Sequence, residues 1–325
     1  MKNTFEIGGM IIKSGEKACL KIPFATRADG SPMFFPVMVA NGTTDGPRLL
    51  LTTGTHGDEY DGMEAIRQQY AKLDPTKLKG VYIGVPVVNI LAFEEGRRSS
   101  ITDGQNLNRV FPGNANGFYA NQVAAALMEK IVSKADYCVD MHGGGNVMSL
   151  EAMCIYRDIG PDGMSEKARN LAKWSGTEFA WNGGGGWGGS LSIEAQLRGV
   201  PTITVEVGGE GRFRDKFFQQ FMAMLNNLLV GLGMIEGQMI YPPKVTHFTG
   251  TFICSKSAGF YHQFVESRDM VKQGQELGVI KDYFGEAHER IIAPCDGIIL
   301  SKRSFATIEV GGWTCMVGKI VDGSW

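Results

Sequence analysis

The sequence predicts an α/β sheet domain followed by a small β domain. Over the first 240 residues, short apolar runs typical of buried strands alternate with segments of helical spacing. A strand–helix–strand order of this kind indicates parallel pairing in a sheet. Beyond Tyr241-Pro242-Pro243 no long helical period remains, and short alternating runs are separated by glycine turns. We therefore expect one domain at residues 1–240 and a second at 241–325.

The elements of the first domain follow from these patterns in order. Residues 1–46 alternate short apolar runs with turn signals and predict a leading β ribbon with a strand at 34–40. The helix expected at 217–232 is apolar enough to serve either the core or an interface in a homo-oligomer. The other expected elements are buried strands at 49–53, 81–88, 137–142 and 201–207, and helices at 62–73, 119–133, 165–174 and 192–197.

The composition excludes several classes of partner. Lys plus Arg (32) nearly balance Asp plus Glu (34), with no long run of either sign, which argues against a nucleic acid or a membrane surface as the main partner. The first twenty residues resemble neither a signal peptide nor a transmembrane helix, so we expect a cytoplasmic protein. The six cysteines form no Cys-x-x-Cys pair and are expected to be reduced thiols.

Imidazole and carboxylate groups stand where expected strands end. His56 and Glu59 follow the strand at 49–53, and His142 ends the strand at 137–142. Strand ends in an open sheet converge on one edge, where ligands usually bind. Two His and one Glu are a common catalytic zinc set, with a fourth position left for water, although other divalent ions fit the same set. The competing interpretation is that His56 and Glu59 only cap the start of a helix.

Two further carboxylates belong to the same predicted edge. Glu206 lies at the end of the strand at 201–207 and is the natural general base, since a carboxylate there can take a proton from water and pass it to a leaving amine. Seen alone, Glu206 would be interpreted as an ion pair with Arg212 or Arg214. Asp140 is either a core group or a partner that fixes the tautomer of His142.

The polar segment at 89–118 carries candidate substrate-binding groups, because long polar segments are more often functional or disordered than structural filler. Arg109 offers a planar fork to a carboxylate, and Asn108 adds a hydrogen bond. Upstream, Arg98 is placed to polarise a scissile carbonyl, with Arg97 as the competing candidate. The ordinary alternative for any one of these arginines is a solvated ion pair.

The remaining candidates are weaker. The glycine-rich loop at 181–190 lacks the spacing of a phosphate-binding loop, so a mobile flap or a close backbone approach is expected there. His247, His262 and His288 are expected to be structural or exposed. Of these, His262 is placed to reach over a pocket from the second domain.

Four ordered motifs resemble the succinylglutamate desuccinylase/aspartoacylase family, the zinc-dependent relatives of the metallocarboxypeptidases. They are Gly54-Thr55-His56-Gly57-Asp58-Glu59, the run from Asp103 to Gly113, Asp140-Met141-His142, and Thr204-Val205-Glu206-Val207-Gly208. The resemblance implies a mixed, mostly parallel sheet flanked by helices, followed by a barrel-like β domain. It implies one Zn²⁺ per chain on His56, Glu59 and His142, with Glu206 catalytic, Asn108 and Arg109 on the substrate carboxylate, and Arg98 on the carbonyl.

The resemblance also implies an activity. It predicts hydrolysis of the amide bond of a small N-acyl (acetyl or succinyl) amino acid, releasing a carboxylate and the free amine; bacterial N-acetyl-diaminobutyrate deacetylases of the family share this chain length and tail. The tail resembles a biotinyl/lipoyl-type barrel but lacks the modified lysine, so we expect it to shape the pocket mouth. The alternatives are a carboxypeptidase-like peptidase and a non-catalytic zinc-binding relative.

Overall fold

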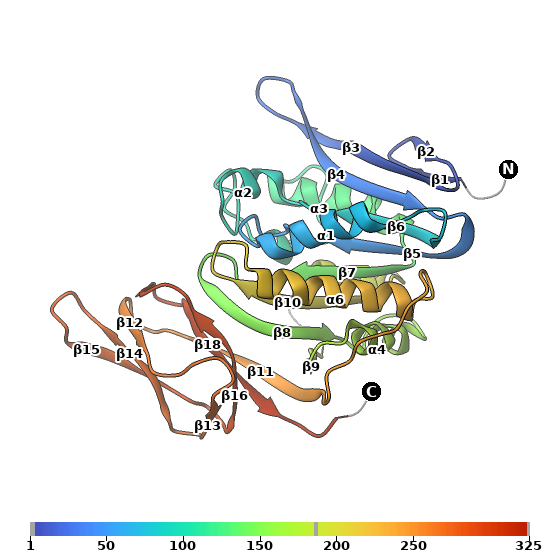
Figure 1. The fold of residues 1–325 in the computed structure, drawn as a ribbon. Helices are drawn as coiled ribbons and strands as arrows, with labels where there is room; N and C mark the ends of the chain where they lie inside the picture. Colours follow the sequence, from blue (N-terminus) through green and yellow to red (C-terminus); the bar gives the residue numbers. More distant parts are fainter. Residues whose placement is uncertain (1–3, 185–187, 324–325) are drawn as a thin grey trace.

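A long mixed sheet organises the computed structural model, which describes residues 4–184 and 188–323 (Figure 1). Twelve of the strands in these residues form this sheet. They are β3 (Glu16–Thr26), β4 (Pro32–Asn41), β5 (Thr44–Thr52), β6 (Lys79–Val85), β7 (Tyr137–His142), β8 (Met148–Tyr156), β9 (Phe179–Asn182), β10 (Thr202–Gly209), β11 (Thr246–Cys254), β13 (Met270–Val271), β16 (Gly297–Arg303) and β18 (Trp313–Ile320). Their spatial order is β13-β16-β18-β11-β9-β8-β10-β7-β5-β6-β4-β3.

Strand direction in this sheet changes from region to region. Pairing is parallel along β6-β5-β7-β10 and along β8-β9-β11, and antiparallel at the remaining junctions. The mixed α/β fold that the sequence predicts is thus confirmed. A mostly parallel sheet is not confirmed, because five of the eleven neighbouring pairs among the described strands of this sheet are parallel. One cause lies after β7, where residues 143–147 lead directly into β8. So short a connection cannot make the crossover that a parallel strand needs, and β8 pairs antiparallel with β10.

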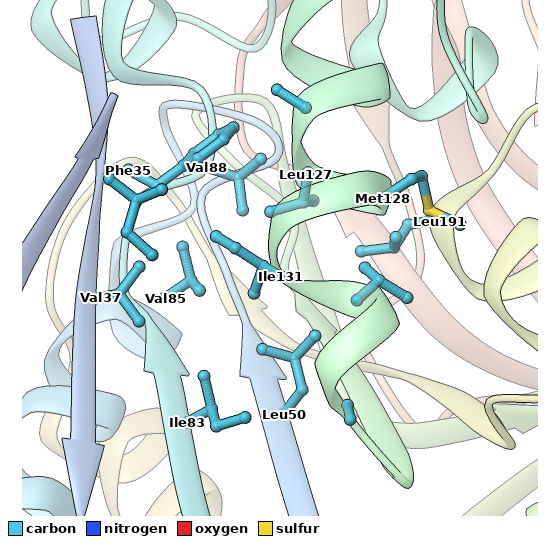
Figure 2. Close-up of a cluster of buried hydrophobic side chains, with 14 of the residues drawn as sticks. Phe35, Val37, Leu50, Ile83, Val85, Val88, Leu127, Met128, Ile131 and Leu191 are labelled. Atoms are coloured by element: carbon cyan, nitrogen blue, oxygen red, sulfur yellow. The ribbon is translucent and has the colours of Figure 1, made fainter. Parts of the chain in front are cut away.

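Helices cover both faces of the sheet. One face is covered by α1 (Tyr60–Lys72), α4 (Met164–Ser175) and α6 (Asp215–Gly231), and the other by α3 (Tyr119–Lys130) and α5 (Leu191–Leu197). The short helices α2 (Ile90–Glu94), η1 (Leu107–Arg109) and η2 (Val132–Lys134) lie in the connections. Two apolar cores result: the α3 core, between the sheet and α3, and the α1 core, between the sheet and α1. Along β5, Leu50 packs in the α3 core (Figure 2), whereas its neighbours Leu49 and Leu51 pack in the α1 core. This period-two alternation follows from the pleat of a strand buried on both faces.

Burial of these side chains supplies much of the stability. Leu50 and Ile83 are fully buried beneath Leu127 and Ile131 of the α3 layer (Figure 2). Each such leucine or isoleucine contributes about 1.5–3 kcal/mol through burial of its side chain. From the sequence, the apolar face of α6 could serve either the core or an interface. In the structure it packs in the α1 core, through Phe221, Leu225 and Leu228 among others.

The expected strands and helices are present with shifts of a few residues at their ends. Two strands, β8 and β9, were not expected. The sequence of β8, Met-Ser-Leu-Glu-Ala-Met-Cys-Ile-Tyr, contains one β-branched residue, and Ala and Glu are depleted in strands. Its strand conformation therefore comes from burial between β10 and β9 rather than from local preference.

Strands are the only regular secondary structure in the described chain beyond residue 241. In addition to β11, β13, β16 and β18, this part contains β12 (Gly259–Gln263), β14 (Glu276–Lys281), β15 (Ala287–Ile292) and β17 (Thr307–Ile308), which form a four-stranded sheet of order β15-β14-β12-β17. The two sheets share one apolar core, which includes Leu277, Ile280, Ile299 and Val317. The division at residue 240 stays a prediction, since β11 and β16 pair with β9 and β8 of the first part.

The leading ribbon consists of two hairpins. The strands β1 (Phe5–Ile7) and β2 (Met10–Ile12) pair with each other, while β3 and β4 pair along their length and join the sheet through β6. Among the described residues, the helices are all too short or too polar to cross a membrane.

Candidate metal centre and active-site pocket

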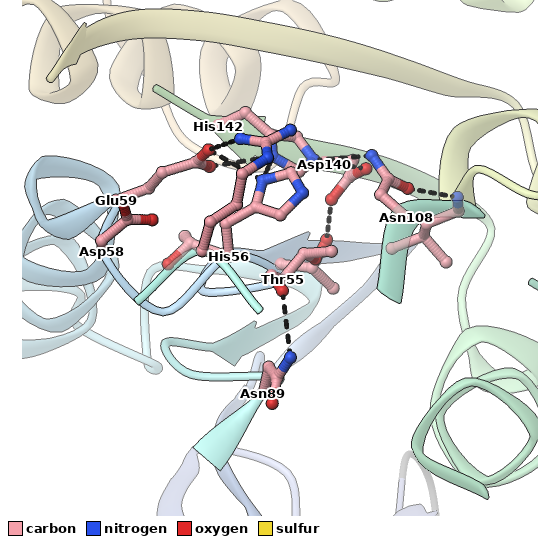
Figure 3. A network of polar contacts seen from close by, with 12 residues as sticks. Thr55, His56, Asp58, Glu59, Asn89, Asn108, Asp140 and His142 are labelled. Carbon is pink, nitrogen blue, oxygen red and sulfur yellow. Dashed lines mark hydrogen bonds and ion pairs between the residues drawn. The ribbon is translucent and has the colours of Figure 1, made fainter. Parts of the chain in front are cut away.

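The three predicted metal ligands meet at the ends of β5 and β7. His56 lies in the loop after β5, Glu59 immediately precedes α1, and His142 is the last residue of β7 (Figure 3). All three are buried, and one ligand atom from each lies within 4.8 Å of the others. Glu59 Oε1 is 2.7 Å from His56 Nδ1, and Glu59 Oε2 is 2.9 Å from His142 Nδ1. Although Glu59 occupies the cap position of α1, its side chain makes no capping hydrogen bond, which excludes the helix-cap interpretation.

The electrostatics of this group fit a cation. The two Nδ1 atoms face each other at 3.2 Å, beside the buried carboxylate. Burial lowers the pKa of His56 to about 4, so its imidazole is neutral, as a metal ligand must be. Burial also opposes the charged form of His142, but the carboxylates of Asp140 and Glu59 outweigh it and raise the pKa of His142 well above its ordinary value. A divalent cation could replace that proton between the three side chains.

A second layer of contacts orients both imidazole rings. Asp140 Oδ2 lies 3.0 Å from His142 Nε2, and Thr52 donates to Asp140 Oδ1 at 3.1 Å. Asn106 Oδ1 lies 3.1 Å from His56 Nε2. These acceptors hold the Nε2 protons, so each ring turns Nδ1 toward Glu59. Of the two roles that the sequence left open for Asp140, the contact with His142 is the one the structure contains; Asn106 was not expected to have such a role.

Glu206 lies beside this group because of strand register. In the parallel pair β10–β7, Glu206 is opposite His142, so both side chains leave the same edge of the sheet. Burial, aided by the negative charge of Glu59, raises the pKa of Glu206 to about 8. The expected alternative, an ion pair with Arg212 or Arg214, is wrong: both arginines pair with Glu210.

Of the two candidate arginines, Arg98 contacts the group directly. Its Nη1 donates to Glu59 Oε1 at 3.2 Å, and its guanidinium carbon lies 5.4 Å from the centre of the Trp313 ring. Arg97 is exposed, at the wall of the same cavity. The position of Arg98 is therefore set by groups from both ends of the chain, since Trp313 begins β18.

Asn108 and Arg109 lie in η1 and line the same cavity. The side chain of Asn106 accepts a hydrogen bond from the Asn108 N–H and so fixes the turn. Asn108 Oδ1 accepts from the Leu191 N–H at 2.9 Å, which leaves its amide nitrogen, 3.2 Å from His142 Nε2, as the end available for donation. Arg109 donates to the Asn108 carbonyl at 2.6 Å, and burial lowers the pKa of Arg109.

One cavity of about 860 Å³ contains all seven predicted site residues. Its floor is the strand edge that carries the two histidines and Glu206. The C-terminal part of the chain contributes an aromatic wall of Phe252, Phe305 and Trp313. Phe252 and Trp313 stack with ring centres 4.6 Å apart, and Phe305 lies in the connection between β16 and β17. This wall was not identified residue by residue from the sequence, because only tertiary packing brings it to the cavity.

The glycine-rich loop also reaches the cavity, through Gly183 and Ser190. Gly189 has φ +80°, and a Cβ there would lie 2.2 Å from the Arg109 carbonyl oxygen. The Gly189 carbonyl accepts a hydrogen bond from the Phe111 N–H at 3.0 Å. The expected close backbone approach is therefore present, whereas the expected flap falls partly on residues 185–187, outside the described residues.

The three C-terminal histidines are away from the centre. His262 is exposed on β12 and does not line the cavity, so the interpretation that it reaches over the pocket is wrong. β12 belongs to the four-stranded sheet rather than to the long sheet whose edge carries the metal-ligand candidates. His288 pairs with Asp282, and His247 is buried near the end of the chain.

Fold and cavity together define an α/β protein whose cavity contains a centre able to hold a divalent metal. Residues 45–232 match the sequence model of the succinylglutamate desuccinylase/aspartoacylase catalytic domain. This match covers more than half of the chain, and the protein belongs to that family. It is accordingly an enzyme of the deacylase type, which confirms the resemblance that its motifs carry.

Individual relatives extend the match over nearly the whole chain. An N-alpha-acetyl-L-2,4-diaminobutyric acid deacetylase of Halomonas elongata is 27% identical over 318 residues, covering 93% of this chain and 91% of the relative. The product-bound ectoine utilization protein EutE (DoeB) of Ruegeria pomeroyi superposes with a TM-score of 0.86 at 25% identity, covering 93% and 95% of the two chains. A succinylglutamate desuccinylase of Silicibacter sp. TM1040, at 22% identity and TM-score 0.84, has the same fold over 94% and 95%.

Proposed function

We propose that the protein is a zinc-dependent amidohydrolase that removes a small acyl group, acetyl or succinyl, from an N-acylated amino acid. The observation that carries the proposal is the meeting of His56, Glu59 and His142 with Glu206 in one cavity. The name of the Halomonas relative, a deacetylase of an N-acetylated diamino acid, supports the same reaction class.

A single Zn²⁺ bound by His56, Glu59 and His142 would supply a Lewis acid and lower the pKa of a water molecule at the site. Glu206, whose pKa is raised by burial to about 8, takes the proton from the attacking water and gives it to the leaving amine. Arg98 lies beside the ligand Glu59, where its positive charge stabilises the negative charge that develops on the carbonyl oxygen of the substrate. Arg109 and the Asn108 amide, which line the same cavity, bind the substrate carboxylate.

The cavity walls bear on the choice between a deacylase and a carboxypeptidase-like peptidase, which would use the same ligands. Phe252, Phe305 and Trp313, all from the C-terminal part of the chain, line one side of the cavity. A wall at that position limits how far a peptide chain can extend from the scissile bond. It therefore favours a small N-acyl amino acid over a longer peptide.

The test pairs metal analysis with a substrate panel. The purified protein is analysed for metal by plasma mass spectrometry, and amine release is followed from N-acetyl and N-succinyl amino acids and from matched dipeptides. About one zinc per chain, with release from acyl amino acids only, is the expected result. Release from the dipeptides alone would instead establish a peptidase, and no zinc uptake would contradict the catalytic assignment.

A further inference from the structure

Arg98, whose charge is proposed to stabilise the substrate carbonyl, lies in the connection that follows α2 rather than in a strand or a helix. Helix α2 ends in a tight turn from Phe93 to Arg97, the Gly96 turn. Gly96, at φ +61°, donates to the Phe93 carbonyl at 3.0 Å. The Arg97 N–H donates to the Ala92 carbonyl at the same distance, which completes a common ending of helices. The Gly96 turn therefore sets where the chain reaches Arg98.

Asn146, which lies between β7 and β8, binds this turn from a distant part of the chain. Its side-chain Nδ2 donates to the Gly96 carbonyl at 2.9 Å. Its backbone N–H donates to Asp58 Oδ2, also at 2.9 Å. Asp58 immediately precedes the metal-ligand candidate Glu59, beside which Figure 3 shows it. Asn146 and Asp58 both line the cavity, so one residue connects the Gly96 turn to the loop that carries candidate ligands.

The connection that carries Asn146 is fixed on both sides. The Gly145 carbonyl accepts from the Gly211 N–H at 2.8 Å. The Val147 carbonyl accepts from the Ser304 N–H at 2.7 Å. The amide of Asn146 is enclosed as well, since a Cβ at Gly211 would lie 2.3 Å from its Oδ1. The side chain that binds the Gly96 turn is therefore itself held in place.

Arg98 is held at the far end of its side chain by other contacts. Its Nη1 donates to Glu59 Oε1, and its guanidinium lies against the Trp313 ring. Because an arginine side chain has many rotamers, these contacts fix the charged group only while the backbone that carries it stays in place. A displacement of about 1 Å at a group that acts on the reacting atoms can lower the rate by about 100-fold. Asn146 binds the backbone just before Arg98 and so limits this displacement.

We propose that Asn146 is a positioning residue for the reaction: by binding the Gly96 carbonyl, it fixes Arg98 where the guanidinium stabilises the charge that develops on the substrate carbonyl. This inference rests on the proposed function, since it uses the role that Arg98 has there. An effect through Arg98 belongs to kcat. A direct contact between Asn146 and the substrate would act on KM instead, and a role in stability alone would act on neither.

The test is a double-mutant cycle on the zinc-loaded protein. kcat, KM and zinc content are measured for the wild type, N146A, R98A and the double variant, with the N-acyl amino acid that the wild type hydrolyses best. We expect N146A to lower kcat by about 10- to 100-fold, with KM within about threefold and about one zinc per chain. In the R98A background the same substitution should change kcat by less than about threefold, because the two residues act as one unit.

Two further variants sharpen the cycle. N146D keeps the shape of the side chain but places a carboxylate oxygen against the Gly96 carbonyl, so it should reproduce the loss. N41A removes a comparable bond, from the Asn41 side chain to the Ile12 carbonyl, at a residue that does not line the cavity. It should leave kcat within about twofold of the wild type.

Equal losses of kcat in the two backgrounds would overturn the inference. So would a rise in KM with kcat unchanged, a loss of zinc from N146A, or full activity of N146D. If N146A does not fold, N146D and its combination with R98A complete the same cycle.

Failure of the proposed function would look different, because the wild type would then release no amine from any substrate. In that case trypsin cleavage after Arg97 and Arg98, followed by mass spectrometry, shows whether Asn146 holds the Gly96 turn. N146A should be cut at these bonds at least about tenfold faster than the wild type and N41A, because the loss of the bond to Gly96 makes local opening easier. Equal cleavage rates in the three proteins would refute the inference.

Discussion

The floor and the walls of the cavity are built in different ways. The floor consists of His56, Glu59, His142 and Glu206 at the ends of three neighbouring strands, where register alone brings them together. The walls combine Arg157 after β8, the glycine-rich loop and aromatic side chains of the C-terminal strands. Chemistry that is common to a family can reside in such a floor, while the walls decide which substrate reaches it.

The largest effect is expected on the floor. Replacing His142 by alanine removes one of three ligands and leaves the buried carboxylates of Glu59 and Asp140 without their shared partner. We expect loss of bound metal and a fall of at least about a thousandfold in kcat/KM, because Lewis-acid stabilisation of this kind is worth several kcal/mol. Metal analysis and amine release measure the two losses; H288A is the control, and a variant that keeps its metal would contradict the ligand assignment.

A smaller effect is expected at Asp140, which contacts the ligand His142 but is not itself a ligand. In D140N the acceptor that holds His142 Nε2 is replaced by a neutral amide, while the shape of the side chain is kept. We expect metal affinity to weaken by about 10- to 100-fold, as is usual for such partners of ligating histidines. Competition with a fluorescent chelator measures the affinity. Unchanged affinity would show that Asp140 serves only the core.

The aromatic wall should matter less than the floor. W313A removes the ring that lies over Arg98, and a cation–π contact of this kind is worth about 0.5–2 kcal/mol. We expect kcat to fall by about 3- to 30-fold with metal content unchanged, and W313F to retain most of the activity. A rise in KM with kcat unchanged would contradict this role and assign Trp313 to substrate binding.

The smallest effect concerns the pH dependence of stability in the metal-free protein. The folded pKa of Glu206, about 8, lies above the ordinary value of 4.5, so the folded state binds this proton more tightly. The resulting stabilisation is complete below the ordinary pKa and is lost as pH rises through about 8. E206Q stays neutral, and its melting temperature should therefore fall less than that of the wild type between pH 5 and 9. Parallel curves for the two proteins would contradict the shifted pKa.

The floor could be predicted from sequence because its information is local. His56 and Glu59 are three residues apart after an apolar run, and His142 and Glu206 each end another such run. The walls could not, because they depend on contacts between distant segments. Arg157 follows a strand with little β propensity of its own, and Trp313 meets Arg98 across most of the chain. Asn106 was overlooked since its role appears only when η1 packs against His56.

The central claim is that Glu206 acts on a metal centre that it does not itself build. The most direct test is to measure zinc content and kcat of E206Q beside the wild type, with the N-acyl amino acid that the wild type hydrolyses best. The account predicts about one zinc per chain in both proteins and a kcat lower by about 10²- to 10⁴-fold in the variant. Full turnover by E206Q with zinc bound would contradict the account.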